Sequence, residues 1–480
     1  MFTLAIIKTH KFSLLLVIIS VVLYSVFAYH LERTDYLKLV SIYAILFVLF
    51  YKLIQLNKEN VNFLTAVAFL FRALFILAIP NLSQDFYRFI WDGRMLLEGY
   101  NPYLYTPESF ISSGKYPIAQ AQELYIGMRE LNASHFTNYP PVNQLCFSIA
   151  ALFAGKSIIG SAFVLRLLII AADFGTLYFG KKLLQKLKLP IYNIFWFILN
   201  PFIIIELTGN LHFESVMIFF LVWSLYLLHS QKWKWAAVVF ALSIATKLVP
   251  LMFLPLFYWW FVKNRNTNIA VYSKQFVEKD VDAISKKKLR NNRIIGMIRL
   301  IKFYSIVLIT TLLLFAPFFS IQFIDNYSKT VGLWFGNFEF NASIYYLLRN
   351  IGYLFRGYNE IAIIGKILPV ITILCILYFS LIIKNSNTKQ LITAMLFSFT
   401  IYLFLSTTVH PWYIATILIL GVFTKYKFPL VWSAIIIISY LAYANTDNTE
   451  NLWVIALEYL VVFSVFIWEV FLKKDKINNI

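Results

Sequence analysis

The chain has 480 residues, of which 60% are apolar and 14% are charged, whereas soluble globular domains carry roughly 25% charged residues. A transmembrane helix uses about 20 residues, so the apolar residues are numerous enough for many such helices. This composition excludes a water-soluble enzyme, a disordered chain and a secreted disulfide scaffold. The net charge of +19 is what basic cytoplasmic loops give a membrane protein, and it requires no nucleic-acid partner. Cys146 and Cys375 both lie in apolar runs and predict no disulfide or cysteine-based metal site.

Long apolar stretches follow one another along the whole chain, and no strand pattern long enough for a barrel is present. We therefore predict an all-α polytopic membrane protein with about 12–14 transmembrane helices. Lys8 and Lys11 precede the first stretch without a small-residue cleavage site after it, which predicts a retained helix and not a signal peptide. The stretches are 12–29, 38–56, 61–80, 141–155, 158–180, 189–206, 213–229, 235–262, 300–319, 361–383, 390–408, 412–424, 429–444 and 452–472.

The basic residues predict the orientation, because Lys and Arg in short loops are retained on the cytoplasmic side. The segment 263–299 has ten bases and three acids and is predicted to be cytoplasmic. Counting spans from it places residues 81–140 and 320–360 outside. The lysines in 181–188 then fall outside too, so either that run lies at the outer interface or the stretch 141–155 does not cross. We favour the global count.

The first outer loop contains an amphipathic helix. Ser83 can cap it, and Gly99 with the following Asn-Pro ends it. Asp85, Arg88 and Asp92 share one face of this helix, which predicts that two carboxylates and a guanidinium face a cavity at the outer interface. The alternative is a ladder of salt bridges on a solvated helix face.

Short strings that combine polar and aromatic residues recur along the chain: Gln84–Arg94, Gly99–Tyr103, Tyr139–Pro141, Asn210–Glu214, Thr246–Pro250, Phe340–Tyr346 and His410–Tyr413. They resemble the motifs of GT-C class glycosyltransferases, in particular the polyprenyl-phosphate-mannose-dependent mannosyltransferases of the family 87 kind. The resemblance covers most of residues 70–420 and implies a core of membrane helices with a first and a fourth outer loop.

This resemblance implies a division of the chain into three parts. Residues 1–60 are two extra N-terminal helices. Residues 61–320 are the GT-C core module with the outer loop 81–140. Residues 321–480 hold the second outer loop and the C-terminal helices.

The resemblance also implies an inverting transferase whose catalytic base is Asp85. The sugar, with mannose expected, would pass from a polyprenyl-phosphate carrier to a lipid or glycan acceptor at the outer face of the plasma (inner) membrane. The family pattern often has two acids in a row, whereas Gln84 precedes Asp85 here. That departure leaves a single base and no support for a metal, so no cofactor is expected. We expect Arg88 to keep Asp85 ionised.

The leaving phosphate is an anion, so the mechanism needs cations or donors where charge develops. Without the resemblance, His410 is equally well a helix-end histidine, and Arg349 an interfacial arginine. Lys247 can instead neutralise a buried carboxylate such as Glu206. The predicted substrate-binding residues are Arg88, Asp92, Lys247, Lys329, Arg349, His410 and Trp412.

Charges inside spans are expensive and each needs a partner. Arg166 and Asp173 lie seven residues apart on one helical face, which predicts a structural pair. His212 and Glu214 resemble a GT-C motif, yet the span count places them nearer the cytoplasm than Asp85. If they belong to the site, the topology of the middle of the chain is wrong.

Two other classes of function fit many spans and buried charges. A secondary transporter or lipid flippase predicts inverted repeats, and none is visible. A non-catalytic assembly partner is the third possibility. The transporter gives no role to the Asp85 helix, whereas the sequence does not decide against the assembly partner.

Overall fold

The computed structural model describes residues 4–262, 278–336, 338–445 and 447–473. Over these ranges the chain is helical, and one isolated bridge joins Phe340 to Thr408. Seven of the described helices are long and apolar enough to cross a membrane, and a pair bent by 47° at Asn200 forms an eighth candidate. The other apolar helices have 10–17 residues. The predicted all-α polytopic class is confirmed.

The helices follow one another along the chain in three groups. The first third holds α1 (Leu4–His30), α2 (Tyr36–Leu56), α3 (Val61–Ala73), α4 (Asp85–Leu97), α5 (Pro107–Ser112), α6 (Ala121–Ala133) and α7 (Pro141–Ala154). The middle holds α8 (Ile158–Lys186), η1 (Ile191–Ile194), α9 (Phe195–Ile198), α10 (Pro201–Ile203), η2 (Ile204–Gly209), α11 (Glu214–His229), α12 (Trp233–Ile244), η3 (Val249–Phe257) and α13 (Tyr258–Val262). The last part holds α15 (Glu278–Phe315), η4 (Ala316–Phe318), α16 (Ile321–Gly336), α17 (Ile344–Arg356), α18 (Ile361–Leu381), α19 (Thr388–Leu405), η5 (Pro411–Tyr413), α20 (Ile414–Val422), α21 (Phe428–Ile435), η6 (Ile436–Ala444), α22 (Leu452–Ile467) and η7 (Trp468–Leu472).

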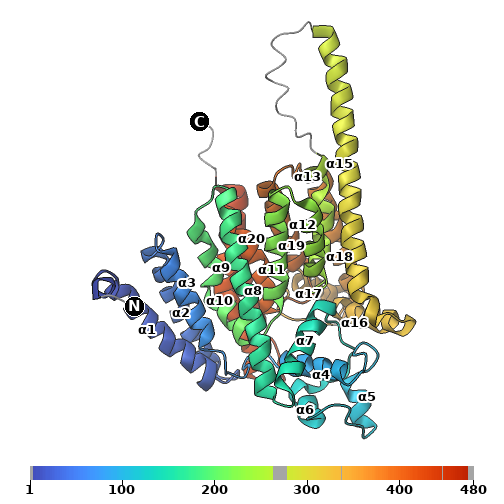
Figure 1. Cartoon of the computed structure of the whole chain (residues 1–480). Coiled ribbons are helices and arrows are strands. Elements are labelled where there is room, and N and C mark those ends of the chain that lie inside the picture. The colour runs from blue at the N-terminus through green and yellow to red at the C-terminus, as the bar shows by residue number, and fades with distance from the viewer. Residues whose placement is uncertain (1–3, 263–277, 337, 446, 474–480) are drawn as a thin grey trace.

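The long helices form a bundle with two different ends (Figure 1). One end holds α4, α5 and α6, and we call it the cavity end. The opposite end holds the start of α15 and the end of the described chain near residue 473, and we call it the basic end. Residues 263–277 and 474–480, which carry part of the predicted cytoplasmic charge, lie outside the described residues.

The lysines that follow α8 belong to the basic end. Lys58, between α2 and α3, lies 5.6 Å from the ring centroid of Tyr192, which follows α8. Lys186 lies 5.8 Å from the ring centroid of Tyr226 in the last turn of α11. The run 181–188 is therefore on the same side as the other basic connections, and its predicted outer position is wrong.

The reason is that α7 does not cross the bundle. Its 14 residues span about 21 Å at 1.5 Å per residue, and it lies with α4–α6 at the cavity end (Figure 1). A Cβ added to Gly93 of α4 would come within 2.2 Å of the Phe147 carbonyl oxygen of α7. The glycine thus permits a backbone contact that fixes α7 to α4, and the stretch 141–155 is removed from the predicted spans.

A second difference offsets the first. The stretch 235–262, predicted as one span, is a hairpin in which α12 runs toward the cavity end and η3 with α13 returns. Pro250 has no N–H to continue a helix, and the turn before it exposes Lys247. At the turn, the Val142 N–H of α7 donates to the Ala245 carbonyl at 2.9 Å. One crossing fewer and one more leave all later spans in their predicted orientation.

The buried charges pair differently from the prediction. Asp173 binds Arg72 of α3 at 2.7 Å, not Arg166, and accepts a hydrogen bond from Ser215 at 2.8 Å. Arg166 donates instead to the Thr208 and Gly209 carbonyls at 2.9 and 3.0 Å. Those carbonyls end η2, a π-helical segment, and an irregular backbone inside a bundle needs such donors.

The topology predicts which side a labelling reagent reaches. In a chain with Cys146 and Cys375 replaced by serine, single cysteines at Glu59, Lys188 and Glu108 report on the α2–α3 connection, the end of α8 and the first outer loop. We expect a membrane-impermeant maleimide to label Glu59→Cys and Lys188→Cys from one side and Glu108→Cys from the other. Labelling of Lys188→Cys together with Glu108→Cys would mean that α7 crosses.

Candidate active site

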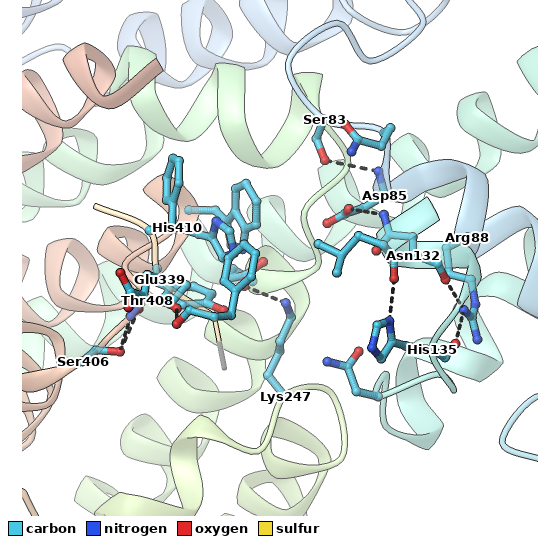
Figure 2. A pocket seen from close by; sticks show the side chains of 18 of the residues that line it. Ser83, Asp85, Arg88, Asn132, His135, Lys247, Glu339, Ser406, Thr408 and His410 are labelled. Atoms are coloured by element: carbon cyan, nitrogen blue, oxygen red, sulfur yellow. Dashed lines mark hydrogen bonds and ion pairs between the residues drawn. The ribbon is translucent and has the colours of Figure 1, made fainter. Parts of the chain in front are cut away.

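A cavity of about 940 Å³ opens among the helices at the cavity end. It reaches down between the spans, because Met217 of α11, Phe399 of α19 and Thr416 of α20 also line it. Figure 2 shows two facing walls, with Lys247 between them. One wall carries Ser83, Asp85, Arg88, Asn132 and His135, and the other carries Glu339, Ser406, Thr408 and His410.

Asp85 is the first residue of α4 and lines the cavity. The N-cap is Gln84, not the predicted Ser83, although the Asp85 N–H still donates to the Ser83 Oγ at 3.3 Å. The Asn132 Nδ2 donates to the Asp85 Oδ1 at 3.1 Å. This bond orients the carboxyl group, and the helix N-terminus favours its negative charge.

Arg88 and Asp92 pair with each other beneath the wall. The Arg88 Nε lies 2.7 Å from the Asp92 Oδ1, and the two residues are 3% and 0% exposed. Gln144 of α7 donates to the other Asp92 oxygen at 3.1 Å. The pair has the spacing of the predicted alternative, a salt bridge along one helix, but it is buried and not solvated.

The same arginine holds the segment that positions Asp85. The Arg88 Nη1 donates to the carbonyls of Asn132 at 2.6 Å and His135 at 2.8 Å. Because Asn132 in turn binds Asp85, Arg88 acts on the carboxylate through this turn and not by direct pairing. The prediction that Arg88 keeps Asp85 ionised is wrong in that respect.

Two opposing effects set the pKa of Asp85. Burial raises the pKa above its ordinary value of 3.8, while the Asn132 hydrogen bond and the charges of Lys247 and Arg33 lower it. Burial is the largest of these effects, so the net shift is upward. A carboxylate with a raised pKa is a stronger base, provided that the surrounding pH keeps it ionised.

Lys247 stands at the tip of the α12–η3 hairpin. Its Nζ lies 2.8 Å from the Glu214 Oε1, so its partner is Glu214 and not the predicted Glu206, which accepts a hydrogen bond from the Tyr440 hydroxyl at 2.8 Å. Lys247 and Glu214 both line the cavity with Asp85. Glu214 therefore belongs to the site, as the corrected topology requires.

Trp412 lies between two histidines. Its ring centroid is 3.8 Å from that of His212 and 4.6 Å from that of His410, and the planes are close to parallel. His410 lines the cavity, and burial together with Lys247 and Arg33 lowers its pKa to about 3. His410 is thus neutral at physiological pH and can serve as a hydrogen-bonding group, not as a cation.

Part of the far wall comes from the second outer loop. Glu339 forms an ion pair with Arg349 and accepts hydrogen bonds from Tyr345 and Asn359. Arg349 lies on the cavity, with its guanidinium 4.2 Å from the Tyr346 ring centroid. Its charge is consequently balanced within the wall.

The structure brings together most of the predicted site residues. Asp85, Arg88, Lys247, Arg349, His410 and Trp412 line the cavity, and their roles stay predictions. Asp92 lies behind the wall, and Lys329 is exposed at the surface, paired with Asp325 at 2.7 Å. Neither is among the lining residues.

Sequence reasoning missed Arg33, Asn132, Glu339 and Glu450, which also line the cavity. Asn132 carried no signal of its own beyond a glycosylation sequon. Arg33 did carry one, because it is the lone base in a short connection predicted to face outward, where bases are disfavoured. Within the described ranges, no group of three or more His, Cys, Asp or Glu side chains is arranged to hold a metal ion.

The chain matches a known family over its first half. The family model is described as alpha-(1->6)-mannopyranosyltransferase, N-terminal domain, and it matches residues 18–263. The chain belongs to this family. The matched part of this alpha-(1->6)-mannopyranosyltransferase family member holds Asp85, Arg88 and Lys247, whereas Arg349 and His410 follow it.

The chain is similar to a curated member of the family, alpha-(1->6)-mannopyranosyltransferase A of Mycobacterium tuberculosis. The two are 20% identical over 200 residues, which is 42% of this chain. The match spans 37% of that relative's length. Membership confirms the resemblance to mannosyltransferases that the motifs indicated.

The buried pair predicts a large and recoverable loss of stability. Arg88→Met leaves the Asp92 carboxylate without its cation, which costs about 3–5 kcal/mol of the free energy of unfolding. Arg88→Met combined with Asp92→Leu is expected to recover most of this loss. Thermal unfolding of the purified protein in detergent measures both.

Lys329→Met is the control, since it breaks an exposed pair with the same i,i+4 spacing that is worth about 0.3–0.5 kcal/mol. The double variant keeps its stability but loses the bonds to Asn132 and His135, so transfer should stay low. Equal melting temperatures for Arg88→Met and Lys329→Met would contradict the buried pair.

Proposed function

We propose that the chain is an inverting mannosyltransferase that takes mannose from a polyprenyl-phosphate carrier and transfers it to a hydroxyl of a lipid or glycan acceptor. The observation that carries the proposal is Asp85, held in the wall of a large cavity at the end of the bundle opposite the basic end. Family membership supports mannose as the sugar. By the distribution of bases, the cavity faces the outside of the plasma (inner) membrane.

The chemistry needs one base. The acceptor oxygen attacks the anomeric carbon of mannose, a new C–O bond forms as the bond to the phosphate oxygen breaks, and the acceptor proton passes to Asp85. Since Asn132 occupies the Oδ1 of Asp85, the Oδ2 is left for the acceptor hydroxyl. Direct displacement inverts the configuration at the anomeric carbon.

The leaving phosphate takes both electrons of the broken bond and needs compensation. Lys247 lies between the two walls and supplies a positive charge (Figure 2). Neutral His410 supplies hydrogen bonding from the far wall. Glu214 holds the Lys247 ammonium group in place at 2.8 Å.

A lipid-linked donor fits the position of the cavity. Its lining includes side chains of the membrane spans α11, α19 and α20 as well as those of the first outer loop. A polyprenyl tail can thus stay in the bilayer while the sugar phosphate reaches Asp85. A water-soluble donor would not need a site at this depth.

The assignment of Asp85 as the base predicts the effect of an isosteric replacement on transfer. Asp85→Asn removes the proton acceptor and keeps the shape, so transfer should fall about 10²- to 10⁴-fold. The measurement is transfer of radiolabelled mannose from polyprenyl-phosphate mannose in isolated membranes. Asp325→Asn, an exposed acid of α16, is the matched control and should keep full activity.

Two results would count against the proposal. Full transfer by Asp85→Asn would refute the assigned base. No transfer by the wild type with any lipid-linked sugar would refute the enzyme and favour the transporter.

The raised pKa of Asp85 predicts the acid limb of the pH profile. Only the ionised carboxylate acts as a base, so kcat/KM should fall as the pH drops through a pKa above 3.8. The Asn132 hydrogen bond stabilises the charged form and lowers this pKa. Asn132→Ala should therefore move the acid limb to higher pH, and a limb that stays in place or moves to lower pH would exclude Asp85 as the titrating base.

A further inference from the structure

Arg33 lies in the connection between α1 and α2 and lines the same cavity as Asp85. Its Nη1 donates to the Gln84 Oε1 at 2.9 Å, across 51 residues of sequence. Its guanidinium carbon lies 3.2 Å from the ring centroid of Tyr443. Two neutral side chains from opposite parts of the chain thus hold this cation at the cavity.

The other shielded cations on the cavity are already balanced. Arg88 pairs with Asp92, Lys247 with Glu214, and Arg349 with Glu339. Among the half-buried or buried Lys and Arg side chains that line the cavity in the described part of the chain, Arg33 alone has no carboxylate within ion-pair distance. Its guanidinium therefore has no carboxylate bound directly to it.

Arg33 also has an unused hydrogen-bond donor. Its Nε is buried and has no acceptor among the described residues. A guanidinium presents five N–H groups in a planar fork, and a buried donor without a partner is costly. The protein alone thus leaves part of this guanidinium unsatisfied, and an oxyanion in the cavity would balance its charge.

The Arg33 guanidinium keeps its charge because its partner Gln84 is neutral. An amide and a carboxylate have nearly the same shape, so a glutamate at this position would bind Arg33 equally well and neutralise it. The Gln84 amide binds the Arg33 guanidinium without neutralising its charge.

Arg33 and Lys247 act on the same part of the cavity. Arg33 and Lys247 both lower the pKa of Asp85 on one wall and of His410 on the other. An anion between the walls is thus within the field of both cations.

We infer that Arg33 binds the phosphoryl group of the sugar donor, with Lys247 as the second cation. Guanidinium groups bind phosphate oxygens in a bidentate manner. The phosphoryl ligand follows from the site itself, whereas its identification as the donor's phosphate rests on the proposed transferase function. Arg33 would make the α1–α2 hairpin part of the substrate site.

The experiment compares two lipids that differ only in the phosphate. The full-length protein in lipid nanodiscs is titrated with polyprenyl phosphate and with the neutral polyprenol of the same length. The wild type should prefer the phosphate. Arg33→Gln should weaken phosphate binding about tenfold or more without changing polyprenol binding, and Arg33→Lys should restore most of the loss.

A second variant tests the charge without removing Arg33. Gln84→Glu should weaken phosphate binding about as much as Arg33→Gln, because the new carboxylate neutralises the guanidinium. Arg356→Gln, an exposed arginine that pairs with Glu360, and Gln390→Glu, exposed at the start of α19, are matched controls. Both should bind like the wild type.

The outcomes separate this inference from the proposed function. Wild-type phosphate affinity in Arg33→Gln, an equal loss for phosphate and polyprenol, or failure of Arg33→Lys would overturn the inference. An Arg33-dependent preference for the phosphate without mannose transfer would support the phosphate site and refute the transferase. Arg33-dependent binding of a nucleotide-linked mannose, with none of polyprenyl phosphate, would keep the phosphoryl site and refute the lipid donor.

Discussion

The geometry of Asp85 depends on a buried ion pair that does not touch the Asp85 carboxyl group itself. Arg88 and Asp92 neutralise each other beneath the wall. The remaining Arg88 donor fixes the turn whose Asn132 orients the Asp85 carboxyl group. A charge inside such a wall is tolerable only when it is paired and hydrogen-bonded. The geometry of Asp85 and the stability of the wall therefore rest on the same guanidinium.

The sequence alone predicted structural features that depend on residues close together in the chain. The helix that carries Asp85 and its end near Gly99 follow from spacing within 15 residues, whereas its N-cap and the position of Asp92 behind the wall did not. The motifs added the class of enzyme. Contacts between distant segments were not predictable, such as Asn132 with Asp85 across 47 residues or Arg33 with Gln84 across 51. No pattern along a single helix specifies which loop lies opposite it.

The topology shows that two errors in the predicted spans can cancel. Hydrophobicity finds apolar segments, but it does not distinguish a crossing helix from α7, which packs on α4, or one span from the α12–η3 hairpin. The lysines of 181–188 were the signal that one segment had been misassigned. Buried charges are equally ambiguous, since Arg166 and Asp173 share a helical face and yet bind different partners.

The two walls of the cavity have a consequence for the making of the protein. Asp85 and Asn132 belong to the first third of the chain, whereas His410 and Tyr443 belong to its last sixth. A chain is synthesised from its N-terminus, so the early helices enter the membrane while the far wall does not yet exist. The enclosed compartment forms only when the final helices are inserted, and a ribosome-bound intermediate carries a carboxylate that faces open surroundings.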